Sequence, residues 1–279
     1  MLIVHLHGGL GNQLFQVATG AYHAKKWNLP LRLNTGRFKR DSVYRRTFDV
    51  EKVFKLNANY EVVDINKYVE KFARLQCSVL NTHVYNVNPV GDLRLPVCED
   101  KGVKKVYFDG YWQSQLFFPS KLDTKNLFEF RLDNLCDTYI ASVKMLLDDA
   151  SVCVVHMRNF GNKIDDIGVE YYLRAIRHYA EKYGCNRYVI VGKEISHLET
   201  LKSNFPDFYF EQQTGNICED FFLMMNAKYF IGANSTFSWW AAYLSSHTDA
   251  CKVFPKKRLR GQTTEWGFDG LFCDDWTLL

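Results

Sequence analysis

Short apolar runs alternate with amphipathic segments through the second half of the chain, and this alternation constrains the fold more than any other feature. Strands are expected at 152–156, 187–192, near 208, at 229–232 and near 252. Helices are expected at 170–183, 196–204, from 219 and from 236. Strands that alternate with helices are typical of a parallel sheet covered by helices. The second half is therefore predicted to be a Rossmann-like domain.

The first half repeats this pattern less regularly. Strands are expected at 2–7, 30–33 and 106–109. Residues 35–100 are polar and aromatic with few clear periods, and we expect them to include binding loops. A chain of 279 residues that is 47% hydrophobic can bury two cores of about 130 to 150 residues each. We therefore predict an α/β protein with two Rossmann-like domains, at 1–145 and 146–279.

Composition sets limits on partners and location. The net charge of +4 is spread along the chain, and the longest basic cluster, at 256–260, is expected to be a solvated surface. There is no basic stripe with interleaved aromatic residues, so we expect no nucleic-acid partner. No apolar run approaches the roughly 20 residues needed to cross a bilayer, so we expect no membrane span. Eight cysteines without a Cys-x-x-Cys pair favour core thiols in a soluble cytoplasmic protein.

The opening strand runs into a glycine turn and then into a helix, for which Asn12 is a candidate N-cap. Backbone N–H groups of the turn and the positive end of the helix would point at one small region, which suits a phosphate. Leu14 stands where the dinucleotide-binding fingerprint has its third glycine, which argues against a standard NAD site. The alternative is a plain strand-to-helix turn with no ligand.

Two later strands also end in residues suited to an anion. His156 and Arg158 follow one strand with the same side-chain parity, and the arginine could fork onto a phosphate. The strand at 229–232 is followed by polar residues at a helix start: Asn234, Ser235, Thr236 and Ser238. A good N-cap above a buried tryptophan pair would also explain these residues. Three such strand ends together favour a pyrophosphate held without a metal.

A metal site is not expected. The chain has no Asp-x-Asp pair of the kind that holds the cation in many nucleotide-sugar transferases, and its adjacent acidic pairs are expected to face solvent. His5 and His7 could be read as metal ligands at a strand end, as in some amidohydrolases. The further His, Lys and Asp positions that such an enzyme requires are missing.

Four segments resemble the motifs of the α-1,2-fucosyltransferases of glycosyltransferase family 11. They are Gly-Gly-Leu-Gly-Asn-Gln-Leu-Phe-Gln at 8–16, Gly-Tyr-Trp-Gln-Ser at 110–114, His-Met-Arg at 156–158 and Asn-Ser-Thr-Phe-Ser-Trp-Trp-Ala-Ala at 234–242. The resemblance implies a GT-B fold, in which two Rossmann-like domains face each other. It also implies inverting, metal-independent transfer of L-fucose from GDP-fucose to a hydroxyl of an oligosaccharide acceptor, with an α-1,2 linkage and no required cofactor. The donor would bind mainly to the second domain, and the acceptor would enter from the first.

The resemblance implies roles for the matched residues. Arg158 would neutralise the charge that develops on the departing diphosphate, and His156 would hold the ribose or phosphate beside it. Asn12, with Gly9 and Gly11, would close over the fucosyl-phosphate from the first domain. The phosphates would be received by the late motif, at Asn234, Ser235, Thr236 and Ser238.

The chain departs from the family pattern at two places. After Arg158 the family has a second arginine and then Gly-Asp, whereas this chain has Asn-Phe-Gly-Asn at 159–162. Asp165 or Asp166 would have to replace the missing acidic residue. The family's Ser-Asp-Asp after the next strand is Gly-Lys-Glu here, at 192–194. Two alternatives therefore stay open, namely the same fold with another linkage or donor and a nucleotide-binding protein without catalysis; no carboxylate is singled out as the general base.

Overall fold

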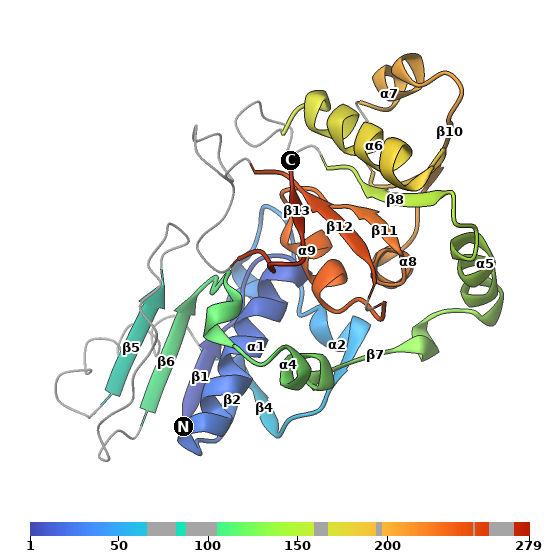
Figure 1. The fold of residues 1–279 in the computed structure, drawn as a ribbon. Helices are drawn as coiled ribbons and strands as arrows, with labels where there is room; N and C mark the ends of the chain where they lie inside the picture. The colour runs from blue at the N-terminus through green and yellow to red at the C-terminus, as the bar shows by residue number, and fades with distance from the viewer. Residues whose placement is uncertain (66–81, 88–104, 159–166, 194–196, 248, 257–270) are drawn as a thin grey trace. The chain divides into compact units, whose positions relative to one another are not determined.

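The chain forms two compact α/β units, each built on a parallel sheet (Figure 1). The computed structural model describes residues 1–65, 82–87, 105–158, 167–193, 197–247, 249–256 and 271–279. Unit 1 comprises Met1–Arg131 and Phe268–Phe272, and unit 2 comprises Leu132–Gly267 and Cys273–Leu279. The change of unit after Arg131 precedes the helix α5 (Asp137–Leu147), within which the expected boundary between 145 and 146 falls.

Unit 1 contains a five-stranded parallel sheet in the order β4-β2-β1-β6-β5. Its strands are β1 (Leu2–His5), β2 (Leu31–Asn34), β4 (Tyr60–Val63), β5 (Thr82–Val87) and β6 (Lys105–Gly110). The helix α1 (Leu10–Trp27) connects β1 to β2 and packs on both (Figure 1). All of β1 is buried, as expected for a strand in the middle of a parallel sheet.

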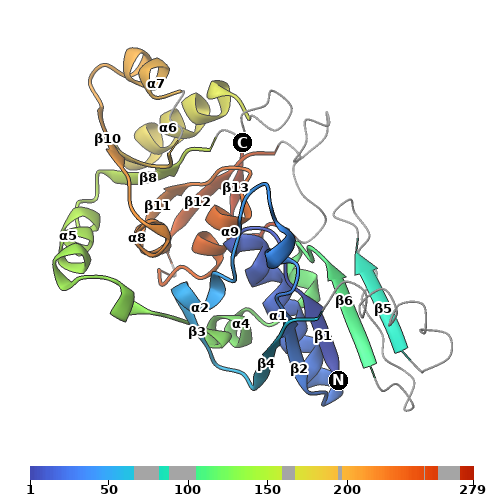
Figure 2. The ribbon, with the colours of Figure 1, turned by 180° about the vertical axis from the view of Figure 1, so that it is seen from behind.

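Short elements complete unit 1. The strands β3 (Phe54–Leu56) and β7 (Phe128–Phe130) form an antiparallel pair. The remaining helices are η1 (Phe38–Arg40), α2 (Val50–Val53), η2 (Gln115–Phe117) and α4 (Lys121–Leu127). Figure 2 shows β4, β2, β1 and β6 from behind. The strands β3, β4, β5 and β7 were not expected, because their segments show no clear hydrophobic period in the sequence.

Unit 2 contains a six-stranded parallel sheet in the order β10-β9-β8-β11-β12-β13. Its strands are β8 (Val152–His156), β9 (Arg187–Val191), β10 (Tyr209–Gln213), β11 (Tyr229–Ile231), β12 (Cys251–Phe254) and β13 (Thr277–Leu278). Its other helices are η3 (Leu132–Asn134), α6 (Val169–Tyr183), α7 (Leu198–Asn204), α8 (Ile217–Met225) and α9 (Thr236–Tyr243). The expected alternation of strands and helices is confirmed, and η3, α5 and β13 are additions to it.

The side chains of β8 alternate between the two faces of the unit 2 sheet. Cys153, Val155 and Met157 lie in the core that the sheet shares with α6 and α7. His156 instead lies against Phe237 of α9. Figure 1 shows α6 and α7 on one side of this sheet and α8 and α9 on the other. His156, the last residue of β8, therefore lies on the face of the sheet that α9 covers.

Two buried tyrosines of α6 fix this helix over the sheet. The Tyr171 hydroxyl donates to the Gly232 carbonyl at 2.6 Å, just beyond β11. The Tyr179 hydroxyl donates to the Cys251 carbonyl of β12 at 2.7 Å. A buried hydroxyl without a partner costs about 1–3 kcal/mol. These two bonds avoid that cost and hold α6 in register with the strands.

The six cysteines of the described residues are free thiols. Four are buried, as predicted: Cys153, Cys185, Cys218 and Cys273. The prediction of core thiols is wrong for Cys136, which is exposed at the N-cap of α5 with its Sγ 3.2 Å from Thr138 Oγ1. Cys251 is only partly buried, and Cys77 and Cys98 lie outside the described residues.

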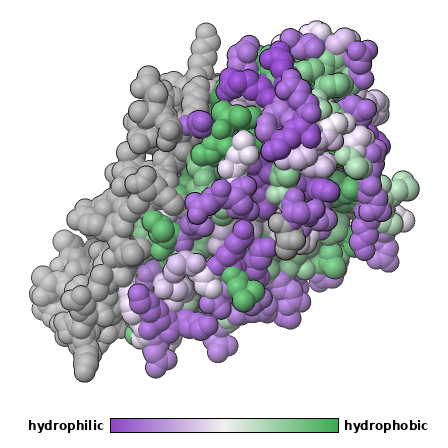
Figure 3. All heavy atoms as spheres, in the orientation of Figure 1, coloured by the Kyte–Doolittle hydropathy of each residue, from purple (hydrophilic) through white to green (hydrophobic). Residues whose placement is uncertain are grey.

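The face drawn in Figure 3 is mainly hydrophilic, with hydrophobic residues in separate groups. Four large hydrophobic residues expose 69% to 79% of their surface: Val43, Tyr44, Leu122 and Met145. Within the part of the chain that the structure describes, no helix is both long enough and apolar enough to span a bilayer.

Candidate functional site

The ends of β8 and β11 bring two of the expected motifs together in unit 2. The strands are neighbours, and Val155 of β8 is in register with Ile231 of β11. One residue further, the ring centroid of His156 lies 5.9 Å from that of Phe237 in α9. Parallel strands end at the same edge of a sheet, where ligands of such folds bind. The His-Met-Arg and Asn-Ser-Thr motifs therefore form one candidate site at this edge.

Glycine is required where the chain leaves β9 beside the end of β8. The Met157 N–H donates to the Val191 carbonyl at 2.9 Å, which continues the strand pairing beyond β8. Gly192 has φ 149°, and a Cβ there would lie 2.2 Å from the Met157 carbonyl oxygen. Gly192, which stands where the family has serine, thus has a structural role, because only glycine permits this close approach.

Tyr172 of α6 fixes the backbone on both sides of Met157. Its hydroxyl donates to the His156 carbonyl at 3.4 Å and accepts a hydrogen bond from the Arg158 N–H at 3.3 Å. Tyr172 is fully buried, whereas Arg158 is exposed. The backbone of the strand exit is therefore held in place while the guanidinium remains at the surface, where an anion can reach it.

His156 is a buried, neutral imidazole. Only 5% of the residue is exposed. Burial, helped by the positive charge of Arg158, lowers the pKa of His156 to about 3. Its Nδ1 atom has no hydrogen-bond partner among the described residues. A neutral imidazole has one donor and one acceptor nitrogen, so His156 can bind a neutral hydroxyl or complement an oxygen without carrying charge.

The N-terminus of α9 adds polar groups next to His156. Ser235 is the N-cap, and its Oγ accepts a hydrogen bond from the Phe237 N–H at 3.3 Å. Its own hydroxyl hydrogen stays available for donation in another direction. Thr236 is half-buried and Asn234 is buried. The helix start therefore offers side-chain donors and the positive end of a helix dipole at one place.

Ser238 differs from the other residues of this motif. It is fully buried, and its hydroxyl donates to the carbonyls of Ala233 at 3.3 Å and Ser235 at 3.0 Å. The Ser238 side chain therefore stabilises the turn that contains Ser235. In this arrangement its hydroxyl hydrogen is engaged with the backbone rather than directed outwards.

In unit 1 the helix α1 begins earlier than expected. Gly9 is the N-cap, with φ −77° and ψ 175°, and the helix starts at Leu10. The prediction that Asn12 caps the helix is therefore wrong, because the glycine turn lets the chain enter the helix sooner. Asn12 lies in the first turn, where its Oδ1 accepts a hydrogen bond from Gln113 Nε2 at 2.9 Å. No acidic residue stands in this turn, and Gly11 is buried inside it.

Two buried glutamines of α1 hold the strand ends and a loop of unit 1 together. Gln16 accepts from the His7 N–H at 3.1 Å and donates to the Gly110 carbonyl at 3.0 Å, which links the ends of β1 and β6. Gln13 donates to the Thr47 carbonyl at 2.9 Å and accepts from the Asp49 N–H at 2.9 Å. Sequence reasoning missed both residues. The signal was present, because two glutamines stand within the apolar face of a helix.

An ion pair at the strand ends of unit 1 was also missed. Arg37 follows β2 and makes two bonds to the Asp109 carboxylate of β6, Nη1–Oδ1 at 2.6 Å and Nη2–Oδ2 at 2.9 Å. The Asp109 side chain is 10% exposed and that of Arg37 is 25% exposed. A paired, forked geometry of this kind orients both groups. The one signal in the sequence was an acidic residue at the end of an apolar strand.

His7 lies beside this ion pair as a neutral imidazole. Burial, then the charge of Arg37, lowers the pKa of His7 to about 4, although Asp109 and a hydrogen bond to the Gly110 carbonyl oppose the shift. The ring packs edge-on against Tyr111 at 4.6 Å between centroids. Its Nε2 has no hydrogen-bond partner among the described residues.

The two histidines at the end of β1 have different surroundings. The Nδ1 atom of the fully buried His5 lies 2.9 Å from Asn34 Nδ2, while His7, two residues beyond β1, packs against Tyr111. No group of three or more His, Cys, Asp or Glu side chains suited to a metal ion occurs among the residues that the structure describes.

The expected site residues divide between the two units. Gly9, Gly11 and Asn12 lie in unit 1. The others lie in unit 2, namely His156, Arg158, Asn234, Ser235, Thr236 and Ser238. The segment 159–162, Asp165 and Asp166 lie outside the described residues, as do Glu194 and most of the 256–260 cluster.

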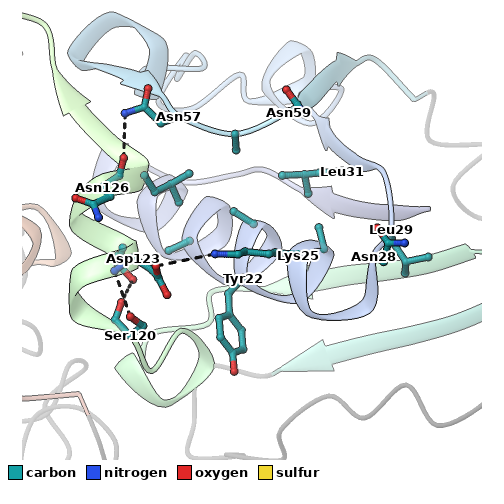
Figure 4. A pocket seen from close by; sticks show the side chains of 16 residues that line it. Tyr22, Lys25, Asn28, Leu29, Leu31, Asn57, Asn59, Ser120, Asp123 and Asn126 are labelled. Carbon is teal, nitrogen blue, oxygen red and sulfur yellow. Dashed lines mark hydrogen bonds and ion pairs between the residues drawn. The ribbon is translucent and has the colours of Figure 1, made fainter.

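A pocket of about 540 Å³ lies elsewhere in unit 1, along the C-terminal half of α1 and against α4 (Figure 4). Lys25 and Asp123 approach to 4.0 Å at its wall, and Asn57 donates to the Asn126 carbonyl at 3.0 Å. None of the four sequence motifs lines it. It is therefore separate from the strand ends of unit 1, which adjoin the N-terminus of α1.

Comparison with known proteins matches residues 155–277 to the model for glycosyl transferase family 11. The chain is 27% identical over 275 residues to an α-1,2-colitosyltransferase of Escherichia coli, and the match covers 91% of each protein. It is 25% identical over 299 residues to the O-antigen biosynthesis glycosyltransferase WbnK of Escherichia coli, with 92% of this chain and 94% of that protein covered. The resemblance to glycosyltransferase family 11 is confirmed.

The fold of the chain is also found in solved structures. POFUT1 in complex with GDP-fucose aligns with a TM-score of 0.52 and 13% identity, over 91% of this chain and 97% of that chain. At this identity the similarity shows the fold alone. The predicted GT-B type of fold, with two α/β units built on parallel sheets, is confirmed.

The motifs shared with family 11 contain two kinds of residue. Gln13, Gln16 and Ser238 are fully buried and bond to backbone groups. Asn12 and Arg158 keep part of their side chains at the surface. In this chain the matched segments therefore hold the backbone at two strand edges and also present polar groups there.

Proposed function

We propose that this family 11-like glycosyltransferase transfers L-fucose from GDP-fucose to a hydroxyl of an oligosaccharide acceptor, with inversion, an α-1,2 linkage and no metal. The observation that carries the proposal is the strand edge of unit 2. There an exposed arginine follows β8, and the Ser235-capped start of α9 adjoins the same edge. A pyrophosphate carries its charge on oxygens that suit an arginine fork and a helix N-terminus.

In this proposal residues 146–279 bind the donor. The acceptor hydroxyl attacks the anomeric carbon of fucose and releases its proton to water, the bond from that carbon to the phosphate oxygen breaks, and GDP leaves. Arg158 neutralises the charge that develops on the leaving diphosphate, which is the larger part of the catalytic task in such a reaction. Asn234, Ser235 and Thr236 receive the phosphates, while Ser238 supports their turn through its backbone bonds.

His156 is proposed to hold the ribose or phosphate beside Arg158. The low pKa of His156 supports a neutral ring. A neutral ring binds the ribose or phosphate through a hydrogen bond from or to one ring nitrogen and not through a positive charge. The Nδ1 atom, without a partner among the described residues, is the group that a donor hydroxyl or oxygen would satisfy.

Residues 1–145 are proposed to bind the acceptor and to close over the fucosyl-phosphate through Gly9, Gly11 and Asn12. The bond from Gln113 to Asn12 Oδ1 supports this role, because it directs the amide nitrogen of Asn12 away as a donor. The turn also leaves open space beside Gly9, where an added Cβ would meet nothing within 4 Å.

A second candidate is the same reaction with a different donor or linkage. The E. coli relative that is named a colitosyltransferase favours it, as does the Gly-Lys-Glu departure after β9. A third candidate, a nucleotide-binding protein without catalysis, rests on the acidic residue that is missing after Arg158.

We propose a cytoplasmic location, which the free thiols of the described residues support.

The test combines binding and turnover in the presence of EDTA. Thermal unfolding is followed with GDP, GDP-fucose, GDP-colitose and a UDP-sugar, and release of free nucleotide is measured with each sugar donor. The proposal expects stabilisation by GDP and turnover of GDP-fucose without metal. Preferential turnover of another donor would establish the second candidate, binding without turnover on any acceptor would establish the third, and activity that requires a cation would contradict the metal-free reaction.

A further inference from the structure

A loop of unit 1, residues 37–46, carries an unusual concentration of positive charge. It contains five basic residues and a single acidic one, in a chain whose net charge is only +4. The basic residues are Arg37, Lys39, Arg40, Arg45 and Arg46. The glycosyl-transfer proposal uses none of them. Arg37 pairs with Asp109 and Lys39 pairs with Asp64, both outside the loop, and the positive charge that remains produces a positive potential around this loop.

The tip of the same loop exposes two hydrophobic residues. Val43 is 79% exposed and Tyr44 is 69% exposed. Lys39 and Arg40 precede them, and Arg45 and Arg46 follow them. Single exposed hydrophobic residues are common, but a valine and a tyrosine at the tip of a basic loop form a specific combination. Tyrosine is enriched at the boundary between lipid headgroups and water, where its ring is buried and its hydroxyl stays wet.

The loop is an ordered structure that directs its only acidic group inwards. Asp41 accepts hydrogen bonds from the N–H groups of Tyr44 at 3.0 Å and Arg46 at 3.4 Å. The Arg45 N–H donates to the Asp41 carbonyl at 3.1 Å. These bonds form an Asx-type turn that presents Val43 and Tyr44 at its apex. Because the carboxylate is bonded to the loop's own backbone, it offers less opposition to an approaching anionic surface.

Both ends of the loop are anchored to the buried strand edge of unit 1. At the start, Arg37 forms its two-bond pair with Asp109. After the end, Gln13 bonds to the Thr47 carbonyl and the Asp49 N–H. The Arg46 guanidinium also lies over the Tyr44 ring, 4.3 Å from its centroid. An anchored loop loses little conformational entropy when it binds, which favours docking.

We propose that residues 37–46 form a membrane-docking loop that binds an anionic lipid surface. Arg40, Arg45 and Arg46 contact lipid phosphates, while Val43 and Tyr44 enter the headgroup region. Charge complementarity selects an anionic bilayer as the partner, and the hydrophobic tip selects a bilayer over a soluble polyanion. The proposal is independent of the glycosyl-transfer proposal, because it uses other residues and needs no sugar donor.

The test measures co-sedimentation of the full chain with vesicles of phosphatidylcholine, with and without 30% phosphatidylglycerol. Binding is expected to the anionic vesicles, at least about tenfold tighter than to the neutral ones, and to weaken as salt rises. Since each cationic side chain near such a surface contributes about fivefold to the affinity, Arg40→Gln/Arg45→Gln is expected to bind about twentyfold to thirtyfold more weakly. Val43→Ser/Tyr44→Ser is expected to lose at least about tenfold.

Matched controls remove the same kinds of group elsewhere. Leu122→Ser removes a hydrophobic residue that is 70% exposed, and Lys182→Gln/Lys202→Gln removes two exposed charges from unit 2. Both are expected to bind like the unmodified chain, and thermal unfolding confirms that every variant is folded. The proposal is overturned if the unmodified chain ignores anionic vesicles or if the loop variants bind as the controls do. It is equally overturned if heparin competes fully and Val43→Ser/Tyr44→Ser has no effect, because that result identifies a soluble polyanion as the partner.

Discussion

At the scale of single residues, glycine and tyrosine shape the proposed donor site more than its charged groups do. Gly192 permits β9 to pass the end of β8, and Tyr172 holds the backbone on both sides of Met157. Arg158 and His156 can therefore present their side chains from a fixed backbone. Of these residues, sequence reasoning singled out His156 and Arg158, because side-chain chemistry is visible in a sequence and backbone proximity is not.

Gly192→Ala is expected to destabilise the chain by more than about 2 kcal/mol, since a Cβ would lie 2.2 Å from the Met157 carbonyl oxygen at a φ of 149°. The matched variant is Gly184→Ala, at φ 71° with nothing within 4 Å of the added Cβ, which should cost only about 1 kcal/mol for the positive φ. Urea unfolding measures both. Equal costs would show that the contact with Met157 is not the decisive effect.

At the scale of elements, buried amides define the start of α1. The helix begins at Leu10, and Gln13 and Gln16 bond to three segments around it. The order of strands and helices in unit 2 was predictable, because alternating apolar and amphipathic segments leave a clear period. The strands β3, β4 and β7 were not, because their three or four residues gain their stability from pairing rather than from local pattern.

Gln16→Leu is expected to lower the free energy of unfolding by about 2–4 kcal/mol, because the His7 N–H and the Gly110 carbonyl both lose a buried partner. Gln212→Leu is the control, since Gln212 makes one exposed bond to the Gly192 carbonyl and should cost less than about 1 kcal/mol. Urea unfolding again provides the comparison. If both variants lose the same stability, Gln16 does not join the two strand ends as described.

At the scale of the whole molecule, buried histidines give the chain a defined response to acid. Burial is the largest cause that lowers the pKa of His7 and His23 to about 4 and that of His156 to about 3, below the ordinary 6.5. The unfolded chain then binds more protons than the folded chain. Stability is therefore fully present above pH 6.5 and falls as the pH drops towards 4.

Asp220 has the opposite effect on stability within part of the same pH range. Burial raises its pKa from 3.8 to about 6, so that its contribution to stability is present below pH 3.8 and is lost as the pH rises through 6. His23→Gln is expected to flatten the fall in unfolding free energy between pH 6.5 and 4, and Asp220→Asn to steepen it. Profiles of both variants that run parallel to that of the unmodified chain would contradict this assignment.

The division into two units also limits what a sequence can reveal. The glycine turn of α1 and the arginine after β8 were identified as anion-binding elements from their own neighbourhoods, and the structure places them in different units. The pair Arg37–Asp109 joins residues 72 positions apart. No local pattern predicts such a pair, because it depends on β2 and β6 flanking β1 in the folded sheet.

The most direct test of the account is the rate of GDP release from GDP-fucose with an acceptor present, compared between Arg158→Ala and Arg174→Ala. Arg174 is an exposed arginine of α6 outside the site and serves as the matched control. If Arg158 neutralises the departing diphosphate, its loss should raise the barrier by about 3 kcal/mol and lower kcat by about 100-fold, while the control keeps its rate. An Arg158→Ala enzyme as fast as the control would contradict the account.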